Sequence, residues 1–102
     1  MRIIARKRIV EYGRKHPAAH ASLERWHGIV KRAEWRSLVE VRKALPNADA
    51  VKVDSGRTVT VFNIAGGNFR LLTALHYNHN RAYVLELLTH AEYDAMQWRE
   101  RL

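Results

Sequence analysis

Apolar residues in the first third of the chain recur every three or four positions, which is the period of an α-helix. In the segment Arg6–Lys15, Ile9 and Tyr12 fall on one face, and the basic residues mostly point away. Pro17 then suits the first turn of a second helix, because no backbone N–H is needed there. The apolar stripe of that second helix is Leu23, Trp26, Val30 and Ala33. The two segments predict antiparallel helices joined by a short turn.

The sequence Ser37-Leu-Val-Glu40 predicts the start of a third, shorter helix, because it has the form of a capping box. In such a box the serine oxygen accepts the free backbone N–H of the fourth residue, and the glutamate reaches back to the serine. Leu38, Val41 and Leu45 would share one face, and Pro46 would end the helix.

From Ala50 onward the pattern changes to short runs rich in β-branched residues, separated by glycine- and asparagine-rich turns. Tight turns between strands imply antiparallel pairing. The strands predicted are residues 51–53, 58–64, 69–77 and 81–88, with a further short one at 2–5.

The end of the chain predicts a helix from Thr89 to about Leu102. Thr89-His-Ala-Glu92 is a second capping box, followed by an apolar stripe of Ala91, Ala95, Trp98 and Leu102. Tyr93 lies nearly opposite that stripe on a helical wheel, so this helix is not expected to need it in the core. The predicted fold is therefore α+β: an N-terminal helical hairpin packed on an antiparallel sheet, with a C-terminal helix, in one domain of residues 1–102.

Composition narrows the functional classes. The 102 residues contain no cysteine, which excludes disulfides, thiolate zinc sites and a thiol nucleophile. Lys and Arg number 18 against 10 Asp and Glu, a net charge of +8. Such an excess favours an anionic partner, either a nucleic acid or an acidic protein that covers the basic face, although a well-solvated basic surface would look the same. The N-terminus mixes charges with apolar residues, so we expect neither a signal peptide nor a membrane span, and a cytoplasmic protein.

Three residues are candidates for chemistry on an anion. Arg70 follows a glycine-rich turn and stands on a strand face beside apolar residues, where it could bind phosphate, be solvated, or pair with Glu86 on the next strand. His90 sits in the first turn of the last helix, where free backbone N–H groups attract anions. A histidine there suits general acid–base catalysis near neutral pH, and the alternative is an exposed histidine without a role. Tyr93 lies one turn further along.

The remaining polar candidates carry weaker signals. Lys52 and Arg57 flank the turn at residues 54–56, and both could reach an RNA backbone or simply be solvated strand-end charges. Asn68, in the turn before Arg70, could also contact RNA. The histidines lack nearby carboxylates at ligand spacing, so no metal or other cofactor is expected.

Several of these motifs together resemble the HigB family of type II toxins, within the wider RelE/ParE fold. They are A-E-W at residues 33–35, V-F-N-I at 61–64, G-N-F-R at 67–70 and T-H-A-E-Y-D at 89–94, with Pro17 and Trp26. The resemblance implies a small basic endoribonuclease that cuts messenger RNA on the ribosome. It also implies a helix-turn-helix antitoxin of the HigA type, and binding of operator DNA by the toxin–antitoxin complex.

By position, the resemblance assigns catalytic roles to Arg70, His90 and Tyr93. Arg70 would stabilise charge on the scissile phosphate, while His90 and Tyr93 would share acid–base duty, or Tyr93 would stack on a base. The chain departs from RelE-type members in having Thr58-Val-Thr-Val-Phe where they carry lysines. Two other functions remain open: a non-catalytic toxin of the ParE kind, which acts on gyrase by protein contact, and a plain nucleic-acid-binding module.

Overall fold

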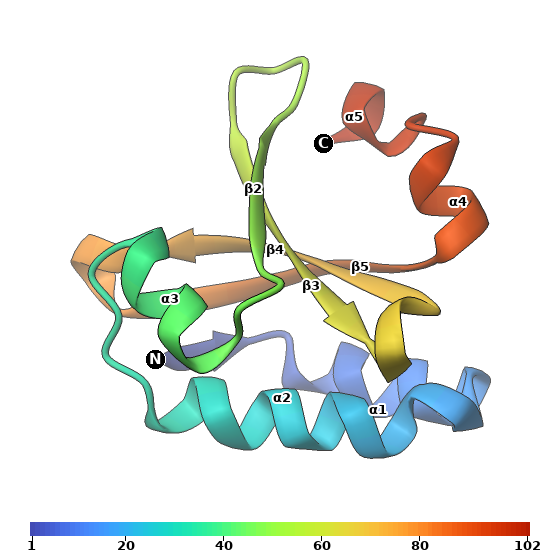
Figure 1. Ribbon diagram of the computed structural model, residues 1–102, viewed down its shortest axis with the longest axis horizontal. Coiled ribbons are helices and arrows are strands. Elements are labelled where there is room, and N and C mark those ends of the chain that lie inside the picture. The colour runs from blue at the N-terminus through green and yellow to red at the C-terminus, as the bar shows by residue number, and fades with distance from the viewer.

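Two helices lie side by side against one face of a five-stranded sheet in the computed structural model, which describes residues 1–102 (Figure 1). Helix α1 spans Arg6–Lys15 and α2 spans His20–Arg32, joined by a 3₁₀ turn at Pro17–Ala19. The predicted hairpin and its apolar stripes are confirmed, since Ile9 is fully buried and Leu23, Trp26 and Val30 are buried along α2.

The sheet has the strand order β1-β5-β4-β3-β2. Its strands are β1 (Arg2–Ile4), β2 (Asp49–Lys52), β3 (Thr58–Ile64), β4 (Phe69–His76) and β5 (Arg81–Thr89). The predicted α+β class is confirmed, and β2 to β5 pair antiparallel as expected. Strand β1, however, pairs parallel with β5, which makes the sheet mixed. No tight turn joins those two strands, so turn chemistry does not determine their relative direction.

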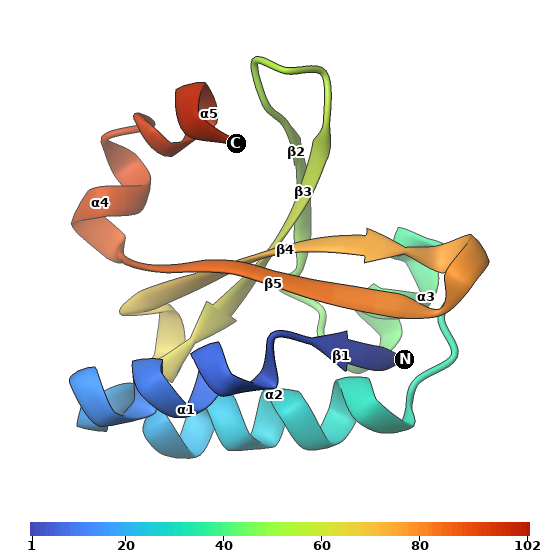
Figure 2. The ribbon, with the colours of Figure 1, turned by 180° about the vertical axis from the view of Figure 1, so that it is seen from behind.

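The two faces of the sheet carry separate apolar clusters. The larger one packs the helical hairpin against the sheet and includes Trp26, Phe62 and Leu71. The smaller one lies on the opposite face and consists of Val53, Val59, Val61, Leu72, Leu88 and Trp98. Figure 2 shows this second face partly covered by the C-terminal segment, which rises beside the β2–β3 hairpin.

The capping box predicted at Ser37 is wrong. Helix α3 does begin there and spans Leu38–Ala44, but the Ser37 side chain makes no capping hydrogen bond. Glu40 Oε1 instead accepts the backbone N–H of Arg36, at 2.8 Å. The carboxylate therefore reaches one residue further back than the motif predicts, and the reciprocal pair does not form.

The continuous C-terminal helix is also wrong. It breaks into α4 (His90–Asp94) and α5 (Trp98–Arg101), with Met96 between them in the left-handed region at φ 63°. Ala91 and Ala95 are exposed, whereas the break brings Trp98 back onto the sheet, where it is 1% exposed. Burying a tryptophan contributes more than the continuous helix would have gained from small alanine contacts. None of the helices is long and apolar enough to cross a membrane.

Candidate active site

Arg70 lies at the start of β4, directly opposite Asn63 on β3 and Leu88 on β5. Its side chain is half-buried on the face that carries the smaller cluster. Nη1 donates to the carbonyl of Gly67, and the guanidinium carbon lies 5.5 Å from the centre of the Tyr93 ring. These contacts hold the guanidinium over an aromatic ring at cation–π distance. Nη1 also donates to the Phe69 carbonyl at 3.4 Å, and Nη2 and Nε have no hydrogen-bond partner within the chain.

The glycine before β4 makes room for this arrangement. Gly67 has φ 93°, a conformation that residues with a Cβ rarely adopt. A Cβ on Gly67 would lie 3.2 Å from Arg70 Nη1, so a larger residue would push the guanidinium away. The glycine-rich turn therefore serves the position of Arg70 as well as the change in chain direction.

A salt bridge between Arg70 and Glu86, which the sequence left open, is not formed. Glu86 instead accepts hydrogen bonds from Arg101 Nη2 at 2.8 and 2.9 Å. This leaves Arg70 without a carboxylate partner, and no ion pair within the chain neutralises it.

Tyr93 packs into the structure, contrary to the expectation that the core would not need it. Its ring stacks on Trp98, with centroids 5.2 Å apart and planes 15° from parallel, and it contacts the smaller cluster. Trp98 Nε1 also donates to the Tyr93 carbonyl at 3.0 Å. The helix break explains this difference, because it folds Trp98 under Tyr93.

The surroundings of Tyr93 raise the pKa of its phenol. Burial raises the pKa of its phenol above the ordinary value of 10.0, and the nearby Asp49 carboxylate raises that pKa further, while Arg70 opposes the shift. The phenol is therefore a proton and hydrogen-bond donor at neutral pH, beside an arginine.

His90 is exposed at the start of α4 and pairs with Asp94 one turn later. Its Nε2 lies 2.9 Å from Asp94 Oδ2. Its backbone N–H donates to the Asn68 carbonyl at 2.9 Å, which ties the beginning of α4 to the turn before Arg70. The Asp94 carboxylate thus lies on the Nε2 side of the imidazole, where it can form an ion pair with the ring when the ring is protonated.

The capping box predicted at Thr89 is confirmed. Thr89 Oγ1 accepts the Glu92 N–H at 3.2 Å, and Glu92 Oε1 accepts the Thr89 N–H at 2.9 Å. These bonds to Thr89 lower the pKa of the Glu92 carboxyl. The capping role of T-H-A-E-Y-D is thus carried by Thr89 and Glu92, and Tyr93 contributes packing on Trp98, while the side chains of His90 and Asp94 have neither role.

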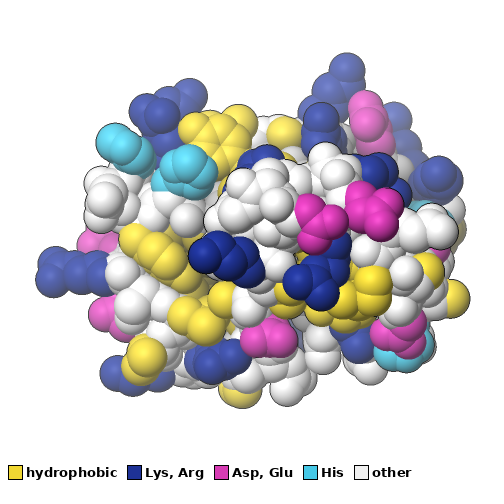
Figure 3. Space-filling view, turned by 90° about the horizontal axis from the view of Figure 1, so that it is seen from above, with side chains coloured by type: hydrophobic (Ala, Val, Ile, Leu, Met, Phe, Trp, Pro, Cys, Tyr) yellow, Lys and Arg dark blue, Asp and Glu magenta, His cyan; other side chains and the backbone are white.

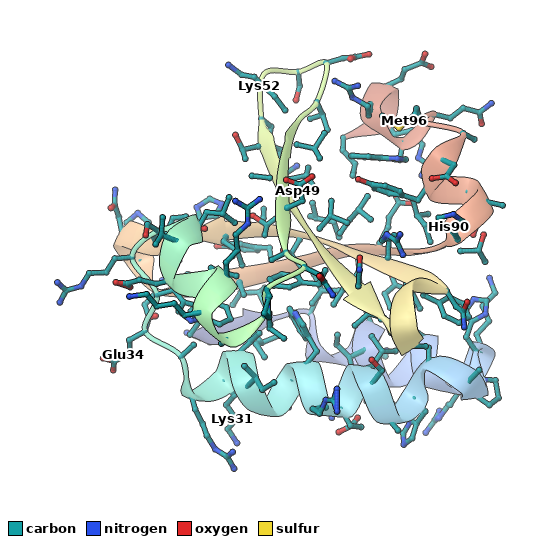
Figure 4. The ribbon with its side chains drawn as sticks, viewed as in Figure 1. Lys31, Glu34, Asp49, Lys52, His90 and Met96 are labelled. Atoms are coloured by element: carbon teal, nitrogen blue, oxygen red, sulfur yellow. The ribbon has the colours of Figure 1, made fainter.

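The candidate residues fall into two groups. Arg70 and Tyr93 are in contact, and His90 lies on the same helix as Tyr93. The backbone N–H of His90 also donates to the carbonyl of Asn68, in the turn before Arg70. Lys52 and Arg57 belong instead to the β2–β3 hairpin, and in Figure 4 the Lys52 side chain points away from α4 and His90. The structure therefore does not bring these two cations to the other candidates, and both side chains are exposed.

Sequence reasoning missed three polar residues on this side of the sheet. Asp94 could have been found from its spacing of four residues after His90 on a helix. Asn63 follows from strand register, since it stands opposite Arg70. Asp49 pairs with Val61 on the same face and bonds Arg42 at 3.2 Å, which no local pattern indicates.

Figure 3 looks down on this side of the molecule and shows Lys and Arg side chains distributed around it, with fewer carboxylates among them. Nowhere in residues 1–102 do three His, Cys, Asp or Glu side chains gather in a way that could hold a metal ion. The available chemistry is therefore that of a guanidinium, a protonated phenol and an imidazole paired with a carboxylate.

Comparison with known proteins agrees with this picture. A family model described as HigB_toxin, the RelE-like toxic component of a toxin–antitoxin system, matches residues 19–96. A protein named mRNA interferase HigB from Escherichia coli O6:H1 is 28% identical over 96 residues, covering 94% of this chain and 91% of that protein. The mRNA interferase toxin HigB of Escherichia coli K12 and the mRNA interferase HigB of Shigella flexneri are each 22% identical, covering 92% of this chain and 88% of theirs.

Proposed function

The chain belongs to the HigB family of RelE-like toxins from toxin–antitoxin systems, and we propose that it is an endoribonuclease that cleaves messenger RNA without a metal ion. The names of its relatives support the activity, because mRNA interferases of similar length align with more than nine tenths of the chain. One domain of residues 1–102 acting in the cytoplasm carries this function.

The observation that carries the proposal is the position of Arg70. Its guanidinium has no carboxylate partner and lies over Tyr93, and the backbone N–H of His90 is bonded to the turn that precedes Arg70. A guanidinium can bind two oxygens of one phosphate and stabilise the charge that develops when the phosphate is attacked.

RNA supplies its own nucleophile, so the protein needs only to move protons and stabilise charge. The 2′-OH attacks the adjacent phosphorus, the 5′-oxygen leaves, and a 2′,3′-cyclic phosphate and a 5′-OH remain. His90 exchanges a proton with the RNA through its imidazole, and the nearby Asp94 carboxylate stabilises the protonated ring. Tyr93 acts as a donor to the leaving oxygen or to the phosphate, since its raised pKa makes it a poor base.

The setting of the reaction is also part of the proposal. We infer that the toxin acts on messenger RNA held by the ribosome, and that a helix-turn-helix antitoxin of the HigA type silences it. The complex of the two would bind operator DNA. The net charge of +8 suits each of these partners, since two are nucleic acids and the third would cover a basic surface.

Two alternative functions make different use of the same surface. A toxin that acts by protein contact, as ParE does on gyrase, would not need the pairing of His90 with Asp94 or an arginine free of carboxylates. A plain binding module would account for the charge but would not need Arg70 to lie in contact with the Tyr93 ring. Both alternatives leave RNA uncut.

The test is cleavage by purified toxin of a defined message on programmed ribosomes, with fragment ends mapped by primer extension. Arg70→Ala, His90→Ala and Tyr93→Phe are compared with Arg32→Ala, which removes an exposed positive charge at the end of α2. Cleavage by the wild type and the Arg32 variant, and its loss in the three site variants, supports the proposal. DNA breaks with intact message would point to the ParE-like function, and neither effect would point to a binding module.

A further inference from the structure

A pocket of about 460 Å³ lies at the open edge of the sheet, and Asn63, which stands opposite Arg70 in the strand pairing, is one of the residues that line it. Helix α2, the end of α3 with the loop after it, and the end of β3 enclose it, and Figure 1 shows how these elements are arranged. Its apolar walls include Ile29 and Leu45, and its polar lining comes from Ser22, Arg25, Asn47 and Asn63. Ser22 Oγ accepts the backbone N–H of Ala65 at 2.9 Å, which fixes the wall between α2 and β3.

The backbone of Asn63 faces this open edge. Strand β2 pairs with β3 only as far as Asp49 opposite Val61, so it ends before Asn63. The backbone N–H of Val53 donates to the carbonyl of Arg57, at the start of the β2–β3 pairing. The odd-numbered residues of β3 therefore point their backbone N–H and C=O groups toward β2. By the alternation of a β-strand, the N–H and C=O of Asn63 point outward as well, where no strand meets them.

The side chains around the pocket are free to bind. The side chains of Asn63, Asn47 and Arg25 make no hydrogen bond within the chain, whereas neighbouring Arg42 is occupied by the Ala48 carbonyl and Asp49. Asn63 alone thus offers a backbone donor, a backbone acceptor and a carboxamide in one place. Arg25 adds a positive charge at the α2 side.

We propose that this pocket binds the base of a nucleotide next to the scissile phosphate. The inference rests on the proposed function and adds a subsite to it. A nucleobase has a flat apolar face and an edge of donors and acceptors, which fits apolar walls with convergent amide groups. Asn63 and Arg70 are cross-strand neighbours on one face, so a base at Asn63 and a phosphate at Arg70 belong to adjacent parts of one RNA strand.

The length of the open edge argues against a peptide strand in the same place. An added strand needs a row of outward backbone groups, and only Asn63 supplies them between Val61, which is paired, and the turn that begins at Ala65. One residue can bond the edge of a base but provides too little for β-strand addition. The observations therefore favour RNA over a protein segment.

The binding test uses a short RNA with 2′-deoxy substitution at the cleaved position, so that it binds without being cut. Amide signals of the intact toxin are followed by NMR as this RNA, or each of the four nucleoside monophosphates, is added. The pocket is blocked by Ala44→Trp, since Ala44 lines it, and Val39→Trp is the matched control at an exposed position of the same helix.

Shifts of the Asn63 backbone and carboxamide signals, lost in Ala44→Trp and kept in Val39→Trp, would support the subsite even if no RNA were cleaved. Shifts confined to Arg70 and Tyr93 would overturn it and leave the proposed function standing. Protection of Asn63 only by the antitoxin would also overturn it, and would give the pocket to the protein partner.

The second readout is cleavage across a message that contains all four bases around many sites. Asn63→Ala is expected to reduce the preference between the best and worst sites by about tenfold, as loss of a bidentate base contact does, with total cleavage changed less. A uniform fall at every site, together with a lower melting temperature, would indicate a structural role for Asn63 and would overturn the inference.

Discussion

The two faces of the sheet differ in how completely they are covered. The face beneath α1 and α2 is closed by a full helical hairpin and contains fifteen of the buried apolar residues. The opposite face has six, covered only by the short C-terminal segment and the β2–β3 hairpin. Arg70 and Asn63 are cross-strand neighbours on this face, where Arg70 is half-buried and Asn63 is exposed.

Because of this difference, most residues that stabilise the fold and the residues proposed for catalysis lie on different faces of the sheet. The interior of the closed face contributes apolar burial, whereas a partly covered face can hold a charged side chain near the surface without full desolvation. Tyr93 belongs to both functions, since it stacks on Trp98 and lies under Arg70. Substitutions on the two faces should therefore differ in their effects on stability and on RNA cleavage.

The largest expected effect is on the closed face. Trp26→Ala should lower the free energy of unfolding by about 3–5 kcal/mol, because it empties a buried aromatic site packed edge-on against Phe62. Denaturant unfolding measures this, and cleavage by the remaining folded fraction should be normal. Trp98→Ala is the counterpart on the open face, and it should reduce cleavage as well as stability. Equal cleavage by the two folded variants would contradict the separation.

Arg70→Ala should reduce kcat/KM for cleavage by about 100- to 1,000-fold, as removal of a charge-stabilising donor does elsewhere. Stability should change little, because the side chain is half-buried and has no ion-pair partner. Arg70→Lys keeps the charge but loses the planar fork, so it should recover only part of the rate. Cleavage that is unaffected in Arg70→Ala would remove the central assignment.

The next largest effect is expected from the comparison of Gly67→Ala with its matched control, Gly56→Ala. Both glycines have positive φ, so each substitution should cost roughly 1–2 kcal/mol of stability. Only at Gly67 would the added Cβ meet Arg70, because nothing lies within 4 Å of the corresponding position at Gly56. Cleavage should fall by about tenfold more in Gly67→Ala, a figure that corresponds to about 1.4 kcal/mol in the transition state. Equal losses would show that the turn does not position Arg70.

The smallest effect concerns the cap at the start of α4. Thr89→Ala should lower the free energy of unfolding by about 1 kcal/mol, because the cap is lost. The folded-state pKa of Glu92 is depressed from its ordinary 4.5, so its contribution is complete above that value and disappears as the pH falls through the folded-state pKa. The free energies of unfolding of wild type and Glu92→Gln, measured by denaturant at each pH, should therefore differ at pH 7. They should become equal in the acid range. A difference that persists in acid would assign the effect to packing rather than to the carboxylate.

Local interactions were predictable from the sequence. The helix at Arg6–Lys15, the strand at Thr58–Ile64 and the cap at Thr89 were all predicted at their observed places. Each depends on residues a few positions apart, through side-chain periodicity, β-branching or a hydrogen bond across one turn. The candidates Arg70, His90 and Tyr93 were likewise identified from short motifs, and their roles remain proposals.

What the sequence determined by itself was the set of elements and the residues with suitable chemistry. Only the tertiary structure decided that the last helix breaks at Met96, because burial of Trp98 outweighs helical continuity. It also decided that Tyr93 packs, that Asp49 lies near its phenol, and that Lys52 stays apart. Each of these outcomes depends on contacts between segments far apart in the chain, whose free energies no local pattern contains.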